Sequence, residues 1–241
     1  MLRLSKRFKI HPLILTTFFV SLLILGSITF GFMVENLRLF QYFDQSVYSF
    51  LQWTWHPAWL GVIITPFNFN FIPLGGPQFL NFLLIIIVAA LIYIYFFRRK
   101  DFYWSVFAVA LAGLFDTFMA FIIPLLIFRP RPFLSLPSSV NEVATNIWQA
   151  LPSYPSGHTR STAIFLTVIM AFLPKKMRLP CALFVIFIAF SRVYLGAHYP
   201  TDVIAGMLIG YLTGKIVLSI IEEIRAVKEE RKKLAAKNKQ P

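Results

Sequence analysis

Residues 79–97 read FLNFLLIIIVAALIYIYFF, and the basic triplet RRK at 98–100 follows at once. Such an apolar run is about the length that an α-helix needs to cross the roughly 30 Å hydrocarbon core of a bilayer. The whole chain is 58% hydrophobic and 14% charged, with a mean hydropathy of +0.70. This composition excludes an ordinary soluble enzyme and predicts an integral membrane protein.

Similar apolar windows recur along all 241 residues. They predict six membrane helices, at about residues 13–34, 79–97, 102–128, 156–173, 179–195 and 200–221. The expected fold class is therefore all-α, a six-helix integral membrane bundle that forms one domain over residues 1–241 with a charged tail at 222–241. The first window is long and no small-residue cleavage site follows it, so we expect a retained helix rather than a signal peptide.

The basic residues predict the orientation of this bundle. Most of the net charge of +13 comes from four segments: before helix one, between helices two and three, between helices four and five, and after helix six. All four fall on one side, whereas the loop 35–78 on the other side holds one basic residue, Arg38. By the positive-inside rule both termini are cytoplasmic, in a multi-pass protein of the cell inner (plasma) membrane. Orientation and contact with anionic membrane lipids explain the charge, so nucleic acid is not an expected partner, and no protein partner can be inferred.

The outer loop also carries Trp53, Trp55 and Trp59. Indole rings favour the headgroup layer of a membrane. We therefore expect an interfacial segment that anchors this part of the chain.

Polar residues concentrate in three short segments, 129–132 (RPRP), 154–158 (YPSGH) and 191–202 (SRVYLGAHYPTD). In the six-helix topology, helix three ends at the first segment and helix four starts at the second. Helix five ends and helix six begins at the third. All three segments therefore share one depth, and we expect one polar site at the extracytoplasmic (periplasmic) edge of the membrane.

These residues suit the binding of an anion. Arg131 and Arg192 offer planar, permanently charged donor groups. Ser156 and Gly157 lie at a helix start, where backbone N–H groups and the helix dipole favour negative charge. Because glycine lacks a side chain, Gly157 would let a phosphate approach the backbone closely.

His198 and Asp202 add reactive chemistry to this site. They are four residues apart, and Pro200 suits the first position of a helix, so the carboxylate should turn back toward the imidazole. A carboxylate bonded to one ring nitrogen sets the tautomer and leaves the other nitrogen able to attack phosphorus. His158, at the start of helix four, is placed to protonate the leaving oxygen.

The three segments resemble the signature motifs of the type 2 phosphatidic acid phosphatases, through Arg131-Pro132, Pro155-Ser-Gly-His158, and Ser191-Arg192 with His198 and Asp202. The resemblance implies that His198 is the nucleophile that forms a phosphohistidine, that Asp202 orients it, and that His158 is the general acid. It also implies phosphate binding by Arg131, Arg192, Ser156 and Gly157. The implied reaction is metal-independent, uses no cofactor and acts on a lipid phosphate, within a six-helix membrane fold.

One position departs from the family pattern. The first family motif has a lysine seven residues before its arginine, and Pro124 stands there in this chain. Arg160, four residues after the second-motif serine, and Arg129 are the candidates to supply the missing phosphate-binding cation. Asp116 lies about 20 Å along helix three from the first-motif arginine, so we expect a buried polar contact or a packing switch there rather than phosphate chemistry.

Two other chemistries use the same residue types. A serine-hydrolase triad of Ser156, His158 and Asp202 is disfavoured, because a serine and a histidine two apart at a helix start face different directions. A zinc site built from His158, His198 and Asp202 is disfavoured because the flanking arginines would repel a cation. We therefore expect no metal.

The expected function is hydrolysis of the terminal phosphate of a membrane lipid phosphate or diphosphate. Undecaprenyl diphosphate is the leading substrate, followed by phosphatidylglycerol phosphate and phosphatidic acid, although no residue pattern identifies the lipid tail. Two alternatives stay open. One is a lipid phosphotransferase that uses the same residues, and the other is a non-catalytic lipid-binding or lipid-translocating protein, which the missing lysine favours.

Overall fold

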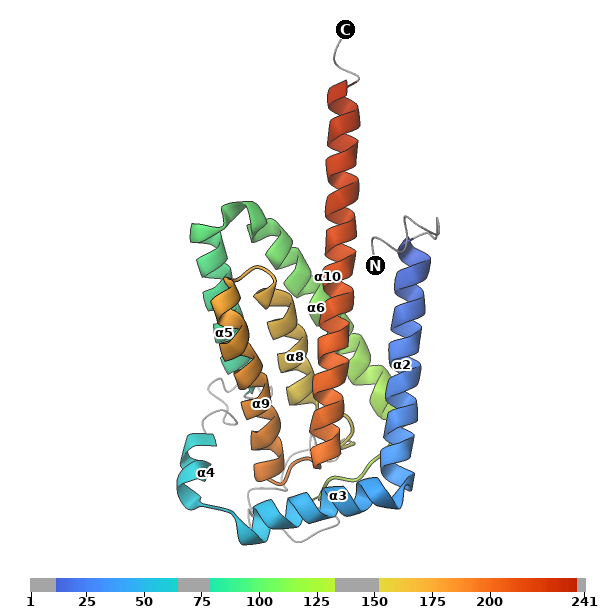
Figure 1. The fold of residues 1–241 in the computed structure, drawn as a ribbon, viewed down its shortest axis with the longest axis vertical. Coiled ribbons are helices and arrows are strands. Elements are labelled where there is room, and N and C mark those ends of the chain that lie inside the picture. Colours follow the sequence, from blue (N-terminus) through green and yellow to red (C-terminus); the bar gives the residue numbers. More distant parts are fainter. Residues whose placement is uncertain (1–11, 65–78, 133–151, 238–241) are drawn as a thin grey trace.

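The structure is a computed structural model that describes residues 12–64, 79–132 and 152–237. Within these residues every regular element is a helix (Figure 1). In chain order they are α2 (Pro12–Asn36), α3 (Arg38–Ser49), the π-helix η1 (Phe50–Thr54), α4 (Ala58–Ile64), α5 (Phe79–Phe97), α6 (Arg99–Leu126), α8 (Gly157–Met170), the 3₁₀ turn η4 (Lys175–Met177), α9 (Arg178–Tyr194) and α10 (Pro200–Lys237). The all-α class is confirmed for the described part of the chain.

A helix lies at each of the six predicted positions. By length and composition four stretches suit a membrane span: Phe19–Asn36, Arg99–Ile123, Lys175–Tyr194 and Pro200–Ala236. Helix α5 contributes a shorter apolar stretch, Leu83–Phe97, and α8 has 14 residues. Six membrane crossings and the sidedness of the termini therefore stay predictions.

Helix α10 is longer than the predicted range 200–221 because its charged continuation is also helical. This continuation is rich in Glu, Lys, Arg and Ala, which are strong helix formers. Lys232 and Glu229, one turn apart, lie 3.5 Å from each other on its exposed surface. The helix therefore extends well beyond its apolar part (Figure 1).

Helix α8 is the centre of the bundle, with ten of its 14 residues buried. It packs closely on α10, where Gly206, Gly210 and Gly214 recur every four residues on one face. A Cβ atom at Gly206 would lie 2.8 Å from the Ser156 carbonyl oxygen, and one at Gly210 would meet the Arg160 carbonyl oxygen. Small residues thus bring the two backbones into direct contact, as they do in many membrane helix pairs.

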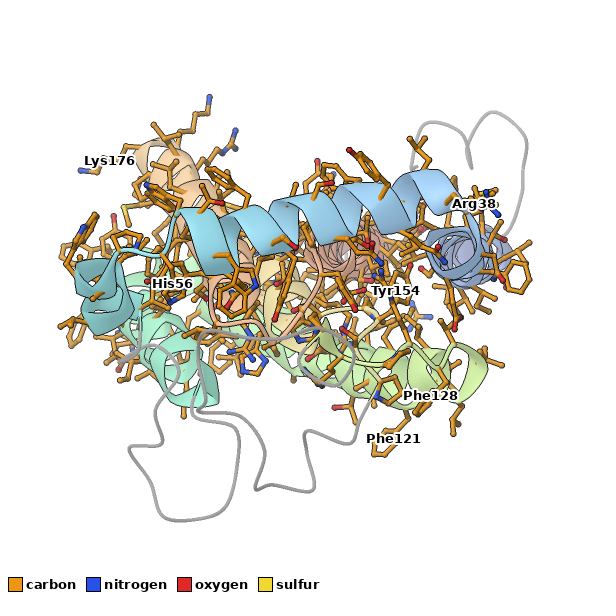
Figure 2. All side chains as sticks on the ribbon, turned by 90° about the horizontal axis from the view of Figure 1, so that it is seen from below. Arg38, His56, Phe121, Phe128, Tyr154 and Lys176 are labelled. Carbon is orange, nitrogen blue, oxygen red and sulfur yellow. The ribbon has the colours of Figure 1, made fainter. Side chains whose placement is uncertain are left out.

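Helix α3 lies across one end of the bundle (Figures 1 and 2). It buries Asp44 and Tyr48 and exposes Leu39, Tyr42 and Phe43. Trp53, Trp55 and Trp59, in and after η1, are also exposed. This arrangement agrees with the interfacial segment predicted for the outer loop.

The opposite end of the bundle carries the basic connections. The α5–α6 and α8–α9 connections lie there, and α10 extends past them (Figure 1). In this region Arg225 of α10 donates to Asp101 of α6 at 2.6 Å, and the pair is partly exposed. The two ends of the bundle thus differ in charge, as the positive-inside pattern requires.

Candidate active site

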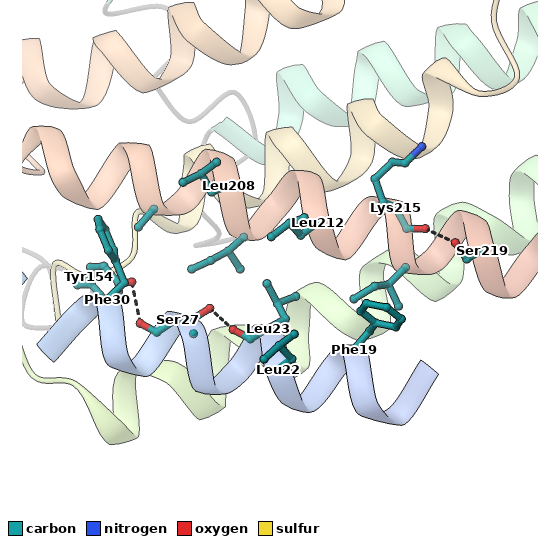
Figure 3. Close-up of a pocket in the computed structure, with 14 residues that line it drawn as sticks. Phe19, Leu22, Leu23, Ser27, Phe30, Tyr154, Leu208, Leu212, Lys215 and Ser219 are labelled. Atoms are coloured by element: carbon teal, nitrogen blue, oxygen red, sulfur yellow. Dashed lines mark hydrogen bonds between the residues drawn. The ribbon is translucent and has the colours of Figure 1, made fainter. Parts of the chain in front are cut away.

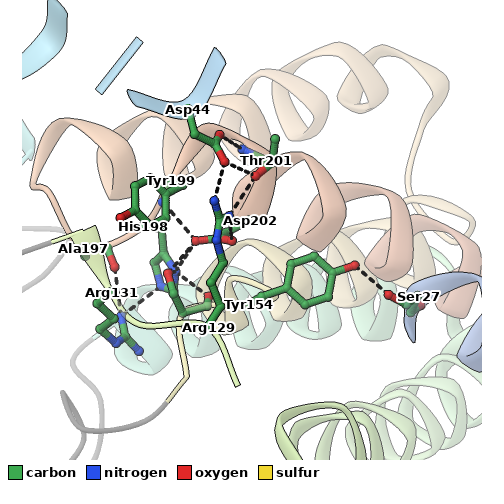
Figure 4. Close-up of polar contacts among 11 residues, drawn as sticks. Ser27, Asp44, Arg129, Arg131, Tyr154, Ala197, His198, Tyr199, Thr201 and Asp202 are labelled. Carbon is green, nitrogen blue, oxygen red and sulfur yellow. Dashed lines mark hydrogen bonds and ion pairs between the residues drawn. The ribbon is translucent and has the colours of Figure 1, made fainter. Parts of the chain in front are cut away.

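The three polar segments predicted to share one depth meet at the end of the bundle that α3 covers (Figure 4). One follows α6, one precedes α8 and one is the turn between α9 and α10. Backbone hydrogen bonds join them: the Ser153 N–H donates to the Arg129 carbonyl at 2.7 Å, and the Ser156 N–H donates to the Asp202 carbonyl at 3.1 Å. Segments far apart in sequence are therefore held in register by the main chain.

The turn that carries His198 is closed by its own backbone. Gly196 has φ 69°, a left-handed conformation that glycine adopts without a side-chain clash. The N–H groups of Ala197 and His198 both donate to the Arg192 carbonyl, at 3.0 and 3.2 Å. Pro200 then starts α10, as its fixed φ favours.

The contacts of His198 determine its tautomer. Its Nδ1 lies 2.8 Å from the Ser153 carbonyl oxygen, which can only accept, so Nδ1 carries the proton. Its Nε2 lies 3.2 Å from a guanidinium nitrogen of Arg131, which can only donate, so Nε2 holds the lone pair. The ring is thus neutral, and its nucleophilic nitrogen faces an arginine.

Asp202 lies beside His198, but at 3.8 Å from Nδ1 its carboxylate is beyond hydrogen-bond distance. The Oδ2 atom instead accepts from the Ser153 hydroxyl at 2.5 Å and from the Tyr199 N–H at 3.0 Å. The expected direct bond between carboxylate and imidazole is therefore corrected: the Nδ1–H group donates to the Ser153 carbonyl, and Asp202 lies close enough to act on the ring through its charge.

The surroundings of His198 keep it neutral. Its side chain is buried, and burial is the main cause that lowers its pKa to about 4. The nearby Arg131 and Arg192 guanidinium groups lower the pKa further, while Asp202 opposes them. The unprotonated, nucleophilic form is therefore the stable one at neutral pH.

Among the predicted phosphate-binding groups, Arg131 contacts Nε2 of this ring directly, and Arg192 lies within electrostatic reach of it. Arg131 donates to the Ala197 carbonyl at 3.1 Å, which holds its guanidinium beside His198. His158, in the first turn of α8, lies within electrostatic reach of Arg192, His198 and Arg131. A phosphate there would be next to the lone pair and to a second histidine.

The start of α8 provides room for an anion. Ser156 occupies the N-cap position of the helix and Gly157 its first position. A Cβ added at Gly157 would meet no heavy atom of the described residues within 4 Å. The helix N-terminus therefore faces open space, as an anion site at a helix start requires.

Arg129, which the sequence offered as a phosphate-binding cation, binds carboxylates instead. One guanidinium nitrogen donates to Asp202 at 2.6 Å and the other donates to Asp44 at 2.5 Å (Figure 4). Its Cζ lies 4.1 Å from the centre of the Tyr199 ring. Burial works to lower the pKa of Arg129, but the two carboxylates outweigh it and raise that pKa. Arg129 is thus a buried structural cation.

Arg160 is also directed elsewhere. Its Nε donates to the Asp116 carboxylate at 2.8 Å, and the Ser161 hydroxyl donates to the other carboxylate oxygen at 2.6 Å. This pair joins α6 to α8, which agrees with the buried polar contact expected for Asp116. Both candidates are thus paired with carboxylates, and a phosphate-binding role for either in place of the lysine missing at Pro124 stays a prediction.

Three residues of the network were not singled out in the sequence. They are Ser153, which links His198 to Asp202, and Asp44 and Thr201, which bond to each other at 2.6 Å. The signal for Asp44 was its position four residues before Tyr48, on one face of a helix.

Among the described residues no group of three or more His, Cys, Asp or Glu side chains is arranged to hold a metal ion. Metal independence itself stays a prediction.

An apolar cavity of about 610 Å³ lies between α2 and α10 (Figure 3). Leu22, Leu23, Leu208 and Leu212 are among its lining residues. Polar groups of its wall bond within the protein: the Tyr154 hydroxyl donates to the Ser27 carbonyl at 2.9 Å, for example. The cavity therefore presents a hydrocarbon surface, and it reaches Tyr154, the chain neighbour of Ser153.

Comparison with known proteins adds family relationships. A family model described as "PAP2 superfamily" matches residues 80–226. Undecaprenyl-diphosphatase BcrC of Bacillus subtilis (strain 168) is 28% identical over 115 residues, which cover 48% of this chain and 57% of that protein. Phosphatidylglycerophosphatase B of the same organism is 28% identical over 182 residues, which cover 71% of this chain and 80% of that protein. The match to the first of these relatives thus spans little more than half of its length.

Two solved structures share the fold. The crystal structure of a transmembrane PAP2-type phosphatidylglycerolphosphate phosphatase from Bacillus subtilis has a TM-score of 0.62 at 24% identity, covering 86% of this chain and 96% of that one. LpxE of Aquifex aeolicus has a TM-score of 0.52 at 22% identity, covering 77% of this chain and 98% of that one. At these identities the likeness concerns the fold alone.

Proposed function

The chain belongs to the PAP2 superfamily, and from that premise we propose that it is a membrane lipid phosphatase that removes the terminal phosphate of a lipid phosphate or diphosphate. The observation that carries the proposal is the tautomer of His198, whose Nδ1–H donates to the Ser153 carbonyl and whose Nε2 lone pair lies beside Arg131. A general anion binder needs the arginines but has no use for a neutral, oriented imidazole. A phosphatase that works through a phosphohistidine needs both.

The proposed reaction has two steps. A phosphate bound by Arg131 displaces that guanidinium from Nε2 and places phosphorus beside the lone pair. Nε2 of His198 forms a bond to phosphorus, the bond from phosphorus to the lipid oxygen breaks, and His158 gives its proton to that oxygen. The resulting phosphoimidazolium is stabilised by the Ser153 carbonyl and the Asp202 carboxylate. Water then attacks phosphorus, the P–N bond breaks and His158 takes a proton from the water, which releases inorganic phosphate.

The arginines and the helix start serve charge stabilisation in this scheme. The transferring phosphoryl group carries its charge on three equatorial oxygens. Arg131, Arg192 and the N-terminus of α8 at Ser156 and Gly157 donate to those oxygens. Donors that are already in place need no reorganisation during the reaction, which is the main source of their effect.

The apolar cavity and the charge distribution support a lipid substrate at the outer surface. The cavity beside Tyr154 suits a hydrocarbon chain. The site lies at the end of the bundle opposite the basic connections, so the positive-inside rule puts it on the extracytoplasmic side of a multi-pass, six-helix plasma-membrane protein. Undecaprenyl diphosphate is the first substrate to test, and phosphatidylglycerol phosphate and phosphatidic acid are the next.

The test is phosphate release by detergent-purified protein from these three lipids in the presence of a chelator. We expect release by the wild type and none by His198→Ala. Brief incubation with radiolabelled substrate should leave acid-labile label on the wild type and none on His198→Ala, and His158→Ala should slow both the formation and the hydrolysis of the labelled form. Label that moves to an added acceptor lipid without free phosphate would identify a transferase. Binding of the lipid without turnover by the wild type would identify a non-catalytic protein and refute the proposal.

A further inference from the structure

The buried residue Asp44 lies outside the residues that match the family model, which begin at residue 80. We propose that Asp44 is a positioning residue for the reaction, which balances the charge of Arg129 so that the Asp202 carboxylate acts with its full field on His198. This inference rests on the proposed function, because it concerns the same reaction. It assigns to α3, on the surface of the bundle, a part in turnover.

Asp44 is completely buried, and its two carboxylate oxygens accept three hydrogen bonds from two residues. Its Oδ1 accepts from the Thr201 N–H at 2.9 Å, and its Oδ2 accepts from the Thr201 hydroxyl at 2.6 Å and from Arg129 at 2.5 Å. The Thr201 N–H belongs to the first turn of α10, whose N–H groups have no partner within the helix. Asp44 thus caps α10 from another helix, one residue before Asp202.

Charges connect Asp44 to the nucleophile. Arg129 holds Asp44 with one nitrogen and Asp202 with the other, so one cation is shared between two carboxylates. With Asp44 present, Arg129, Asp44 and Asp202 together carry a net negative charge. The Asp202 carboxylate, which carries part of that charge, lies 3.8 Å from Nδ1 of the imidazole. Without Asp44, Arg129 would act on Asp202 alone and cancel its field at the ring.

This field matters in the first step of the reaction. The imidazole is neutral before attack and gains positive charge as Nε2 bonds to phosphorus, so Asp202 stabilises the transition state more than the ground state. Asp44 does not lie among the phosphate-binding groups. Its loss should therefore lower kcat and leave KM nearly unchanged.

The outer surface of α3 explains why such a contact is useful. Leu39 and Tyr42 are each 75% exposed, on a helix whose other face buries Asp44. An amphipathic helix of this kind lies in the membrane interface. Asp44 therefore ties the interfacial helix to the carboxylate that acts on the nucleophile.

The test compares Asp44→Asn, Asp44→Glu and the matched control Asp101→Asn, whose carboxylate binds Arg225 at the other end of the bundle. Asparagine keeps the shape of the side chain and loses its charge. By analogy with other residues that orient a reactive group, we expect kcat of Asp44→Asn to fall about ten- to a hundredfold with KM changed less than about twofold. Asp44→Glu should recover part of the loss because it restores the charge, and Asp101→Asn should keep the wild-type kcat.

The double variant Asp44→Asn/Arg129→Gln separates positioning from mere stabilisation. Removal of Arg129 leaves the Asp202 charge unopposed again, so the double variant should turn over faster than Asp44→Asn alone, a non-additive result. A purely structural Asp44 predicts the reverse order, since the second change removes further contacts. Turnover is measured per folded enzyme, from the monodisperse fraction.

The outcomes distinguish the two proposals. Wild-type protein that releases no phosphate overturns the proposed function and this inference together. An active wild type with an equally active Asp44→Asn overturns the inference alone. Loss of kcat in Asp44→Asn that the double variant deepens also overturns it.

Discussion

Two buried arginines, Arg129 and Arg160, make the same kind of contact in two regions of the molecule. Both are nearly inaccessible, at 6% and 4% exposure, and both hold a carboxylate within 2.8 Å. The carboxylate of the first is Asp202, beside His198, at the end of the bundle. The carboxylate of the second is Asp116, between α6 and α8. The two regions therefore contain the same kind of ion pair, and they differ in what lies next to the carboxylate.

This difference indicates where an ion pair serves turnover and where it serves folding. A buried pair that loses one partner leaves an uncompensated charge, so both regions should contribute to stability. In the proposed reaction, only the Arg129 region contains a carboxylate, that of Asp202, whose charge acts on the reacting imidazole. Substitutions in the two regions should therefore affect different measurements.

The largest expected effect is that of Asp202→Asn on turnover. The asparagine side chain can keep a bond to Arg129, but it lacks the charge that stabilises the imidazolium, so kcat should fall on the order of 10³-fold. Asp116→Asn, the matched change in the other region, should keep kcat within about threefold and lower the unfolding temperature. Both are measured as phosphate release per folded enzyme with a parallel thermal melt. Similar losses of kcat in the two variants would contradict the division between the regions.

The second effect concerns the stability contributed by the Arg160 pair. Arg160→Met leaves the partly buried Asp116 with the Ser161 hydroxyl but without its cation, and should cost about 3 kcal/mol in the free energy of unfolding. The double change Arg160→Met/Asp116→Leu removes both charges, and it should recover most of that stability because apolar groups can fill the same space. The measurement is denaturant or thermal unfolding in detergent, with phosphatase assays on both variants. A double variant that is stable but has a raised KM would restore Arg160 to the phosphate site.

The helices of this fold were predictable, because the length and hydropathy of a membrane helix are local properties of the sequence. All six predicted positions contain helices, with ends that agree within a few residues except at the C-terminus of α10. Helix α3 was predicted only as part of an interfacial segment. Its polar residues give no apolar run, and its burial of Asp44 depends on Thr201, which is 157 residues further along the chain.

The meeting of His198, Asp202 and Arg131 was also predictable, because the topology puts their segments at one depth. The partners of each polar atom were not. The Nδ1–H group of His198 donates to the Ser153 carbonyl rather than to Asp202, and Arg129 and Arg160 bind carboxylates from distant segments. The direction of a long charged side chain depends on tertiary neighbours, and spacing along one helix does not contain that information.

The third effect is a shift in the pKa of His198, which is about 4 in the wild type. In the proposed reaction the neutral ring is the nucleophile, so activity should persist down to about pH 4 and fall below it. The unfolded value is near 6.5, so protons bind the unfolded chain more strongly, and stability should decrease as pH falls from about 6.5 to 4. Arg131→Gln removes one cation beside the ring and should raise the pKa of His198.

This shift is measured by NMR titration of protein with ¹³C-labelled histidine. The chain has four histidines, and the His198 signal is assigned by its loss in His198→Gln. Arg160→Met is the control, since its guanidinium is paired with Asp116 and should not act on the ring. A change of equal size in both variants would mean that Arg160 also faces His198, and the two regions would no longer be separate.

The smallest effect is expected from the pair of Asp101 and Arg225, which extends the comparison to exposed side chains. Their separation of 2.6 Å matches that of the Arg129–Asp202 pair, but their side chains are 29% and 34% exposed. Water and salt screen such a pair, so Asp101→Asn should cost at most about 1 kcal/mol, and less at high ionic strength. Asp101 is the better residue to change because Arg225 also lies over the Trp104 ring at 5.1 Å. If Asp101→Asn destabilised the protein as much as Asp116→Asn does, burial would not distinguish these ion pairs. The stability that the two buried pairs contribute would then depend on the geometry of their contacts instead.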